Sequence, residues 1–128
     1  MLEEEGADPA RVVIGHADSY PILEHHLAIV ERGATVEFDF LGMAFTAQER
    51  HGEERLLALV CDLLGRGHVE RVLLSQDVCH DSQLRRYEGS GYTYLTRVFL
   101  PRLREAGVSE DEIETMTVRN PRRLLTIA

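Results

Sequence analysis

Three short segments of the sequence carry polar side chains whose types and spacing could support chemistry. They are residues 15–18 (Gly-His-Ala-Asp), 39–42 (Asp-Phe-Leu-Gly) and 75–77 (Ser-Gln-Asp), and each comes at the end of a short apolar run. If the runs are parallel strands, their carboxyl ends meet at one edge of a sheet, where such folds place their functional residues. His16 and Asp77 could then converge on one divalent cation, because imidazole nitrogen and carboxylate oxygen are ordinary zinc ligands.

These two side chains make at most half of a metal site, because catalytic zinc generally has three or more protein ligands and an open position. A strand-end histidine or aspartate is also more often a helix cap, a turn former or a group that supports a ligand. We expect Asp18 to be a cap and His16 to be a ligand. His25 and His26 lie about 100° apart on a helix, so they cannot chelate one ion together, and we expect surface or packing roles.

The strands that must position these residues follow from the apolar pattern. Residues 11–15, 34–38 and 71–75 are rich in branched side chains and too short for helices, which predicts three strands. Strands that alternate with helices imply parallel pairing through right-handed crossovers, so the sequence predicts an α/β protein. Each strand is mostly apolar on both parities, which is typical of a sheet that is covered on both faces.

Capping and stop residues predict where the helices lie. The first helix is bounded by the cap Ser19 with Pro21 in its opening turn, and by the stop Gly33. The second is bounded by a capping box of Thr46 and Glu49, and by the stops Gly65 and Gly67. A long polar loop follows over residues 77–91, and long loops often carry function. A third helix over residues 92–103 should bend near Pro101, which lacks an N–H. Two further starts are predicted by Ser109 with Glu112, and by Asn120 with Pro121.

Length and composition limit the classes of protein that fit. The chain has 128 residues, with 14 arginines, no lysine and 22 acidic side chains, and its formal net charge is −8. This length fits one compact domain. Nucleic acid is not expected as a partner, because phosphate backbones are generally bound by basic stripes. No signal peptide or membrane-spanning run is recognisable, so we expect a cytoplasmic protein in which Cys61 and Cys79 are free thiols.

Six short motifs occur along the chain in the order in which they stand in a known family of enzymes. They are Val13-Ile-Gly-His16, Arg32-Gly-Ala34, Val72-Leu-Leu-Ser-Gln-Asp77, Gly89-x-Gly-Tyr92, Phe99-Leu-Pro-Arg-Leu103 and Val118-x-Asn-Pro-Arg-Arg123. Together they resemble the phosphotriesterase family of the amidohydrolase superfamily, and among its members the phosphotriesterase-related branch. These proteins are metal-dependent hydrolases, and the resemblance runs from near residue 1 to Ala128.

The resemblance implies that residues 1–128 form the carboxyl-terminal part of a TIM (β/α)8 barrel, with its sixth, seventh and eighth strands. A complete barrel needs about 250 residues, so the barrel is incomplete as given. Family members bind two divalent metals, which we expect to be zinc. By resemblance, His16 is the metal ligand after the sixth strand. Asp77 is the metal ligand after the eighth strand and also the catalytic proton acceptor.

The resemblance also implies a reaction, in which a metal-bound hydroxide attacks an ester, lactone or amide bond of a small-molecule substrate. A phosphotriester is less favoured, because Phe40 stands where organophosphate hydrolases have a relay histidine and Ser19 stands at the other relay position. The candidates for the substrate pocket are Phe40, His80, Tyr87, Gly89 and Gly91. Turn-forming glycines and a packed tyrosine would explain Gly89, Gly91 and Tyr87 equally well, and a solvated loop residue is the favoured interpretation of His80.

The other metal ligands of the family are not in this chain, which has neither a lysine nor a His-x-His pair. We therefore expect the isolated chain to be inactive, with any catalytic site completed by residues outside it. The alternative is a non-catalytic half-barrel. Its apolar inner face and open sheet edges would favour a homo-oligomer or pairing with a complementary amino-terminal half.

Overall fold

The sheet has three strands, as the sequence predicts. The structure is a computed structural model that describes residues 4–43 and 52–126. Its strands are β1 (Val13–Ile14), β2 (Thr35–Phe38) and β3 (Val72–Leu74), and they pair in parallel in the order β1-β2-β3. Each strand lies within the range predicted for it, so the α/β class and the parallel pairing are confirmed.

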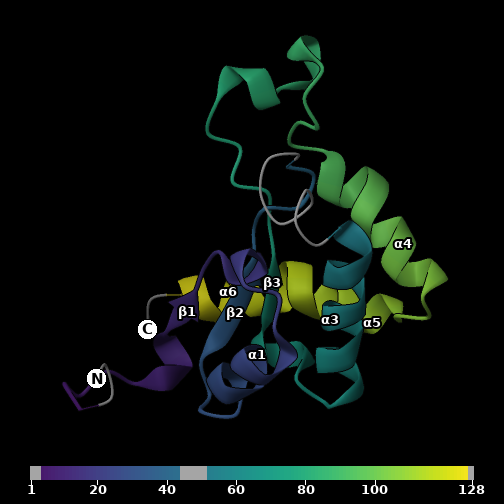
Figure 1. Cartoon of the computed structure of the whole chain (residues 1–128). Helices are drawn as coiled ribbons and strands as arrows, with labels where there is room; N and C mark the ends of the chain where they lie inside the picture. The colour runs from purple at the N-terminus through teal and green to yellow at the C-terminus, as the bar shows by residue number, and fades with distance from the viewer. Residues whose placement is uncertain (1–3, 44–51, 127–128) are drawn as a thin grey trace.

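The core lies between one face of this sheet and the helices that cover it (Figure 1). Val36, Phe38 and Val72 share that face by strand alternation and are fully buried. The covering helices include α1 (Leu23–Val30) and α3 (Glu53–Gly65). Both are amphipathic, and α3 buries a stripe of leucine and valine side chains in the core. The left-handed Gly33 ends the turn after α1, as predicted.

The opposite face of the sheet is more polar and more open than the strand pattern predicts. Alternation places Val13, Glu37 and Leu73 on this face, and the register pairs Glu37 with Leu73. Val13 is 38% exposed, while the other two side chains are half-buried. The expectation of an apolar inner face is therefore only partly right, because a carboxylate stands in the middle strand.

Two widened turns interrupt the carboxyl-terminal helices. The elements are η6 (Leu95–Phe99), α4 (Leu100–Glu105), α5 (Glu110–Glu114), η7 (Thr115–Arg119) and α6 (Asn120–Leu125), of which η6 and η7 are π-helical. Each π turn comes directly before a segment whose second residue is proline, Pro101 or Pro121. Proline lacks an N–H and its ring crowds the preceding turn, and a π turn accommodates both. The disturbance predicted near Pro101 takes this form.

Asn120 does not cap a helix, which corrects the sequence prediction. It lies inside a continuous helical run, and its backbone N–H donates to the carbonyl of Thr115. The side chain is 2% exposed, and its Nδ2 donates to the carbonyls of Val69 at 2.8 Å and Val72 at 2.9 Å. Asn120 therefore ties the last helix to the start of β3.

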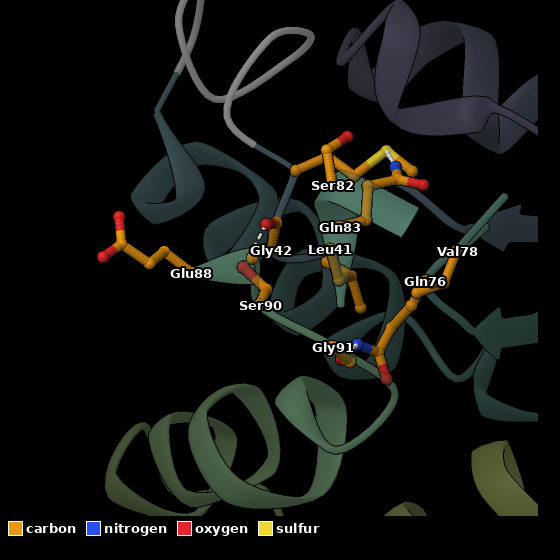
Figure 2. Close-up of a pocket in the computed structure, with 11 residues that line it drawn as sticks. Leu41, Gly42, Gln76, Val78, Ser82, Gln83, Glu88, Ser90 and Gly91 are labelled. Atoms are coloured by element: carbon orange, nitrogen blue, oxygen red, sulfur yellow. Dashed lines mark hydrogen bonds between the residues drawn. The ribbon is translucent and has the colours of Figure 1, made fainter. Parts of the chain in front are cut away.

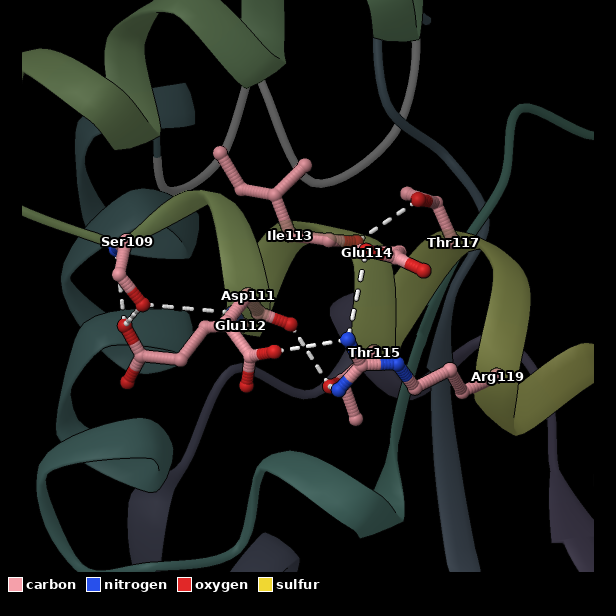
Figure 3. A network of polar contacts seen from close by, with 8 residues as sticks. All are labelled: Ser109, Asp111, Glu112, Ile113, Glu114, Thr115, Thr117 and Arg119. Atoms are coloured by element: carbon pink, nitrogen blue, oxygen red, sulfur yellow. Dashed lines mark hydrogen bonds and ion pairs between the residues drawn. The ribbon is translucent and has the colours of Figure 1, made fainter.

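The predicted capping box of α5 is confirmed (Figure 3). Ser109 Oγ accepts the N–H of Glu112, and the Glu112 carboxylate accepts the N–H of Ser109 at 2.8 Å. Further along the same helical run, Arg119 Nη2 donates to Asp111 Oδ1 at 2.7 Å. Ser19, by contrast, does not cap α1, because it lies in a 3-10 turn and α1 begins four residues after it with no side-chain cap. The predicted box of Thr46 and Glu49 lies outside the described residues.

The loop after β3 projects beyond the carboxyl edge of the sheet (Figure 1). Short 3-10 turns lie here and elsewhere in the chain: η1 (Pro9–Arg11), η2 (Ala17–Ser19), η3 (Val69–Arg71), η4 (Asp81–Gln83) and η5 (Arg85–Tyr87). A Cβ on Gly89 would come within 2.2 Å of the Gln83 backbone, so only glycine fits there. Both cysteines are free, as expected. None of the helices in residues 4–43 and 52–126 has the length and apolarity of a membrane span.

Candidate metal centre

His16 lies two residues beyond the end of β1 and is held by Asp39, which follows β2 directly. Its backbone is left-handed, with φ +54°, and its side chain is 57% exposed. The backbone N–H donates to both carboxylate oxygens of Asp39, at 3.1 and 3.0 Å, and the ring Nδ1 lies 2.9 Å from Asp39 Oδ1. Asp39 raises the pKa of His16, first by this ring hydrogen bond and then by its charge. Since Nδ1 is engaged, Nε2 is the nitrogen left for a metal.

Phe40 completes a reciprocal contact between the two strand ends. Its ring stacks on the His16 imidazole, with centroids 4.5 Å apart and planes 13° from parallel. Its backbone N–H donates to Asp18 Oδ2 at 2.6 Å. Each strand end thus supplies a carboxylate to a backbone N–H of the other, and the two rings stack between them. We call His16, Asp18, Asp39 and Phe40 the strand-end clasp.

Asp18 is part of this clasp and caps no helix, so its predicted role is wrong. The side chain is fully buried, and its second oxygen, Oδ1, has no hydrogen-bond partner within the described residues. Burial raises the pKa of Asp18 to about 6, and the charge of Asp39 adds to the rise, while the N–H of Phe40 offsets part of it. The interaction joins residues 22 apart in sequence, so a local capping rule could not find it.

Asp77 lies at the same edge of the sheet, after β3. It is exposed, and its backbone is also left-handed, with φ +41°. Its charge contributes to the raised pKa of His16. Burial raises the pKa of the half-buried Glu37, and the charges of Asp39 and Asp77 raise it further. Several carboxylates therefore surround one imidazole, and this excess of negative charge favours a bound cation.

The two side chains that the sequence predicts as metal ligands, His16 and Asp77, both lie at this edge. Elsewhere in residues 4–43 and 52–126, as here, no group of three or more His, Cys, Asp or Glu side chains is arranged to hold a metal ion. The donor chemistry and the local charge suit a divalent metal, but the donor number does not complete a site.

A pocket of about 220 Å³ lies beside this edge, between the loops that follow β2 and β3 (Figure 2). Apolar groups, among them Leu41 and Val78, make up most of its lining. Its polar groups bond to one another: Gln76 Nε2 donates to the Gly91 carbonyl at 2.6 Å, and Ser90 Oγ donates to the Gly42 carbonyl. Gly89 and Gly91 belong to the lining, as does Glu88, whose carboxylate points away in Figure 2. The pocket is therefore suited to an uncharged group.

The other predicted pocket residues lie elsewhere. Phe40 packs in the strand-end clasp, and His80 is exposed with its N–H donating to Gln83 Oε1 at 2.7 Å. Tyr87 is half-exposed beneath the guanidinium of Arg86, which lies 4.6 Å from the ring centroid. None of these three lines the pocket between the loops, and their contact with substrate stays a prediction.

The remaining histidines on α1 behave as the sequence predicts. His26 is buried, its Nε2 lies 2.9 Å from the carbonyl of Ala17, and its ring meets Phe38 edge-on. His25 is exposed. The carboxylates near His16 that the sequence does not single out are Asp39 and Glu37. The available sign of the Asp39 contact was an aspartate directly after β2 and a histidine two residues after β1, because these strands are neighbours.

The structure is that of an α/β protein with a parallel sheet and a candidate site at the carboxyl ends of its strands. Comparisons with known proteins identify the family within this class. The sequence profile of the phosphotriesterase family matches residues 1–125. The phosphotriesterase homology protein of Escherichia coli (strain K12) is 35% identical over 121 residues, which are 94% of this chain and 40% of that protein. The N-acetyltaurine hydrolase of Dictyostelium discoideum is 31% identical over 134 residues, which are 99% and 36% of the two chains. The chain belongs to the phosphotriesterase family.

Solved structures of the same family resemble this chain along almost its whole length. The crystal structure of the E. coli phosphotriesterase homology protein, complexed with phosphate in its active site, superposes with a TM-score of 0.90 at 34% identity. The match covers 98% of this chain and 42% of that one. The organophosphorus hydrolase of Deinococcus radiodurans superposes with a TM-score of 0.81 at 31% identity, covering 98% and 40%. The chain thus has a partial α/β fold and spans about 40% of the length of its relatives.

Proposed function

We propose that this chain is part of a divalent-metal-dependent hydrolase that cleaves an ester, lactone or amide bond. The observation that carries the proposal is the placement of His16 and Asp77 at one edge of the sheet, with Nδ1 of His16 engaged by Asp39. In this arrangement His16 would bind the metal through Nε2 and Asp77 would bind it through its carboxylate. A divalent metal, zinc in the simplest case, would supply polarisation of the substrate oxygen and activation of a water.

Asp77 would have a second role. Its carboxylate is exposed at the mouth of the site, so it is placed to accept the proton of the attacking water and pass it on. The pocket beside it would receive the substrate, where Gln76, Ser90 and the loop glycines offer neutral hydrogen-bonding groups. We assign the chain to the sixth to eighth strands of the barrel, because its motifs follow the family order for that part.

The amide and ester classes are favoured over phosphotriesters by the residue at position 40. Phe40 has no proton to relay, and its ring is already stacked on His16. The relative named N-acetyltaurine hydrolase acts, by its name, on an N-acyl amide, while another is named an organophosphorus hydrolase. Amides and phosphotriesters are both uncharged at the reacting group, so the preference rests on Phe40 and not on the pocket.

Two donors do not complete a zinc site, and the chain covers only 36–42% of the relatives' lengths. The test is therefore a chimera in which this chain replaces the matched part of the E. coli phosphotriesterase homology protein. We expect the chimera to bind divalent metal and to hydrolyse members of a panel of N-acyl amides, lactones and aryl esters, while the chain alone does neither.

Variants of the chimera test the residue roles. His16→Ala and Asp77→Ala should lower metal content and abolish hydrolysis, whereas the matched surface variants His25→Ala and Asp81→Ala should keep both. Full metal content in both ligand variants would refute the assignment. Turnover by the isolated 128-residue chain at enzyme-like rates would refute the incompleteness of the site.

A second candidate function is a non-catalytic module that associates with another polypeptide. It is favoured by a groove of about 370 Å³ beside β1, near Tyr20, which is 72% exposed, and Ile22, which is 38% exposed. An open strand edge with apolar neighbours promotes pairing. Light scattering over a concentration series checks it, and a monomer at high concentration counts against it.

A further inference from the structure

Asp39 makes an unusual concentration of contacts with a single residue. Its carboxylate accepts the backbone N–H of His16 with both oxygens and also lies 2.9 Å from the ring Nδ1. The side chain of Asp39 is 9% exposed, whereas the side chain it holds is 57% exposed. A nearly buried carboxylate thus fixes an accessible imidazole.

This contact determines which ring nitrogen carries the hydrogen. A neutral imidazole has one N–H, and an ionised carboxylate can only accept a hydrogen bond. The hydrogen must therefore sit on Nδ1 of His16, which leaves the lone pair of Nε2 directed away from Asp39. The opposite tautomer would place the Nδ1 lone pair against a carboxylate oxygen, and it would lose a hydrogen bond to a charged group.

The remaining members of the strand-end clasp restrict the orientation of the same ring. His16 has a left-handed backbone that few non-glycine residues adopt, and Asp39 holds its N–H in that conformation. Phe40 covers one face of the imidazole at a centroid separation of 4.5 Å. Phe40 is held in turn by Asp18, through the 2.6 Å bond from its backbone N–H.

We propose that Asp39 is a positioning residue, which sets the tautomer and the direction of the His16 ring before any metal is bound. The meaning of this role rests on the proposed function, in which His16 is a ligand through Nε2. The contacts that produce it, however, are all within the chain, so it can be tested without metal and without turnover. Asp39 itself touches neither metal nor substrate in this scheme.

The test is the nitrogen-15 spectrum of the histidine rings of the 128-residue chain, measured without metal at a pH well above the pKa of imidazole. His16→Gln identifies the signals of His16 by their loss. In the wild-type chain we expect His16 with hydrogen on Nδ1 and bare Nε2, in an excess of about 10-fold or more, since a charge-assisted hydrogen bond favours this form.

Asp39→Ala should shift His16 toward the tautomer with hydrogen on Nε2, which free histidine prefers in water. Asp18→Ala is the matched control, because it removes the other buried carboxylate of the clasp and should leave the His16 tautomer unchanged. Backbone amide spectra outside the clasp verify that each variant is folded. If Asp39→Ala does not fold, the isosteric Asp39→Asn replaces it and should lower the Nδ1–H population.

Three results would overturn the proposal: hydrogen on Nε2 in the wild type, an unmoved tautomer in the folded Asp39 variant, or an equal shift in Asp18→Ala. Failure of the chimera to hydrolyse any substrate would leave this outcome untouched. An Asp39 effect on the ring without hydrolysis therefore separates the positioning role from the proposed reaction.

Discussion

Asn120→Ala should destabilise the chain by about 2–4 kcal/mol. The side chain is 2% exposed, and both hydrogens of its Nδ2 are used, at 2.8 Å to the Val69 carbonyl and 2.9 Å to the Val72 carbonyl. Each neutral hydrogen bond contributes about 1 kcal/mol net, and a buried carbonyl that loses its donor adds a further penalty. These bonds cross 51 and 48 residues of sequence, so their loss detaches the last helix from the strand that leads to Asp77.

The assay is urea unfolding followed by circular dichroism, in which a lower midpoint with an unchanged slope reports a loss of stability. Asn120→Asp should cost at least as much near neutral pH, because an ionised carboxylate has the same size but donates no hydrogen bond. Arg123→Ala is the control: it removes an exposed 2.7 Å bond to the neighbouring carbonyl of Glu70 and should cost less than about 0.5 kcal/mol. A loss below about 0.5 kcal/mol in Asn120→Ala, or equal losses in Asn120→Ala and Arg123→Ala, would refute the reasoning.

Three further predictions follow from other contacts. Asp18→Asn should stabilise the chain by up to about 3 kcal/mol above about pH 6 and should change its stability little below about pH 4. The reason is that the folded pKa of Asp18, about 6, lies above the unfolded value, so ionisation of the buried carboxyl costs stability as the pH rises between the two. Equal effects in urea unfolding at both pH values would contradict this. Gly89→Ala should lower the melting temperature, since its Cβ would meet the Gln83 backbone at 2.2 Å, whereas Gly65→Ala has open space and should be neutral or slightly stabilising. Ser109→Ala should cost about 1 kcal/mol in thermal unfolding by removing half of a capping box, and an unchanged melting temperature would count against that box.

The sequence predicts well those features that depend on near neighbours. The box of Ser109 with Glu112 joins residues three apart, and the three strands come from short apolar runs, so both could be found without tertiary information. Asn120 was assigned by the same local rule and proved to be buried, because its partners lie about 50 residues away. Local rules identify a capping residue type, while only packing decides whether the side chain faces its own helix or a strand.

The candidate site shows the same division. The placement of His16 and Asp77 at one edge follows from strand order alone, because parallel strands bring their carboxyl ends together. The partner of His16 does not follow, since Asp39 and Asp18 are similar residues at similar places and only the register assigns one to the imidazole and the other to Phe40. A pattern of residue types therefore predicts where the candidate site lies, and the three-dimensional contacts show which carboxylate holds the imidazole.

The middle strand has a different role from its two neighbours. β1 and β3 lead into the proposed donors His16 and Asp77, whereas β2 is followed directly by Asp39 and Phe40, which hold and cover the imidazole. Adjacent parallel strands lie about 4.8 Å apart, so donors on β1 and β3 start about 10 Å from each other and must both lean over the end of β2 to meet at one ion. Substitutions at the end of β2 should therefore tune the geometry of metal binding, while substitutions of the two donors should remove it.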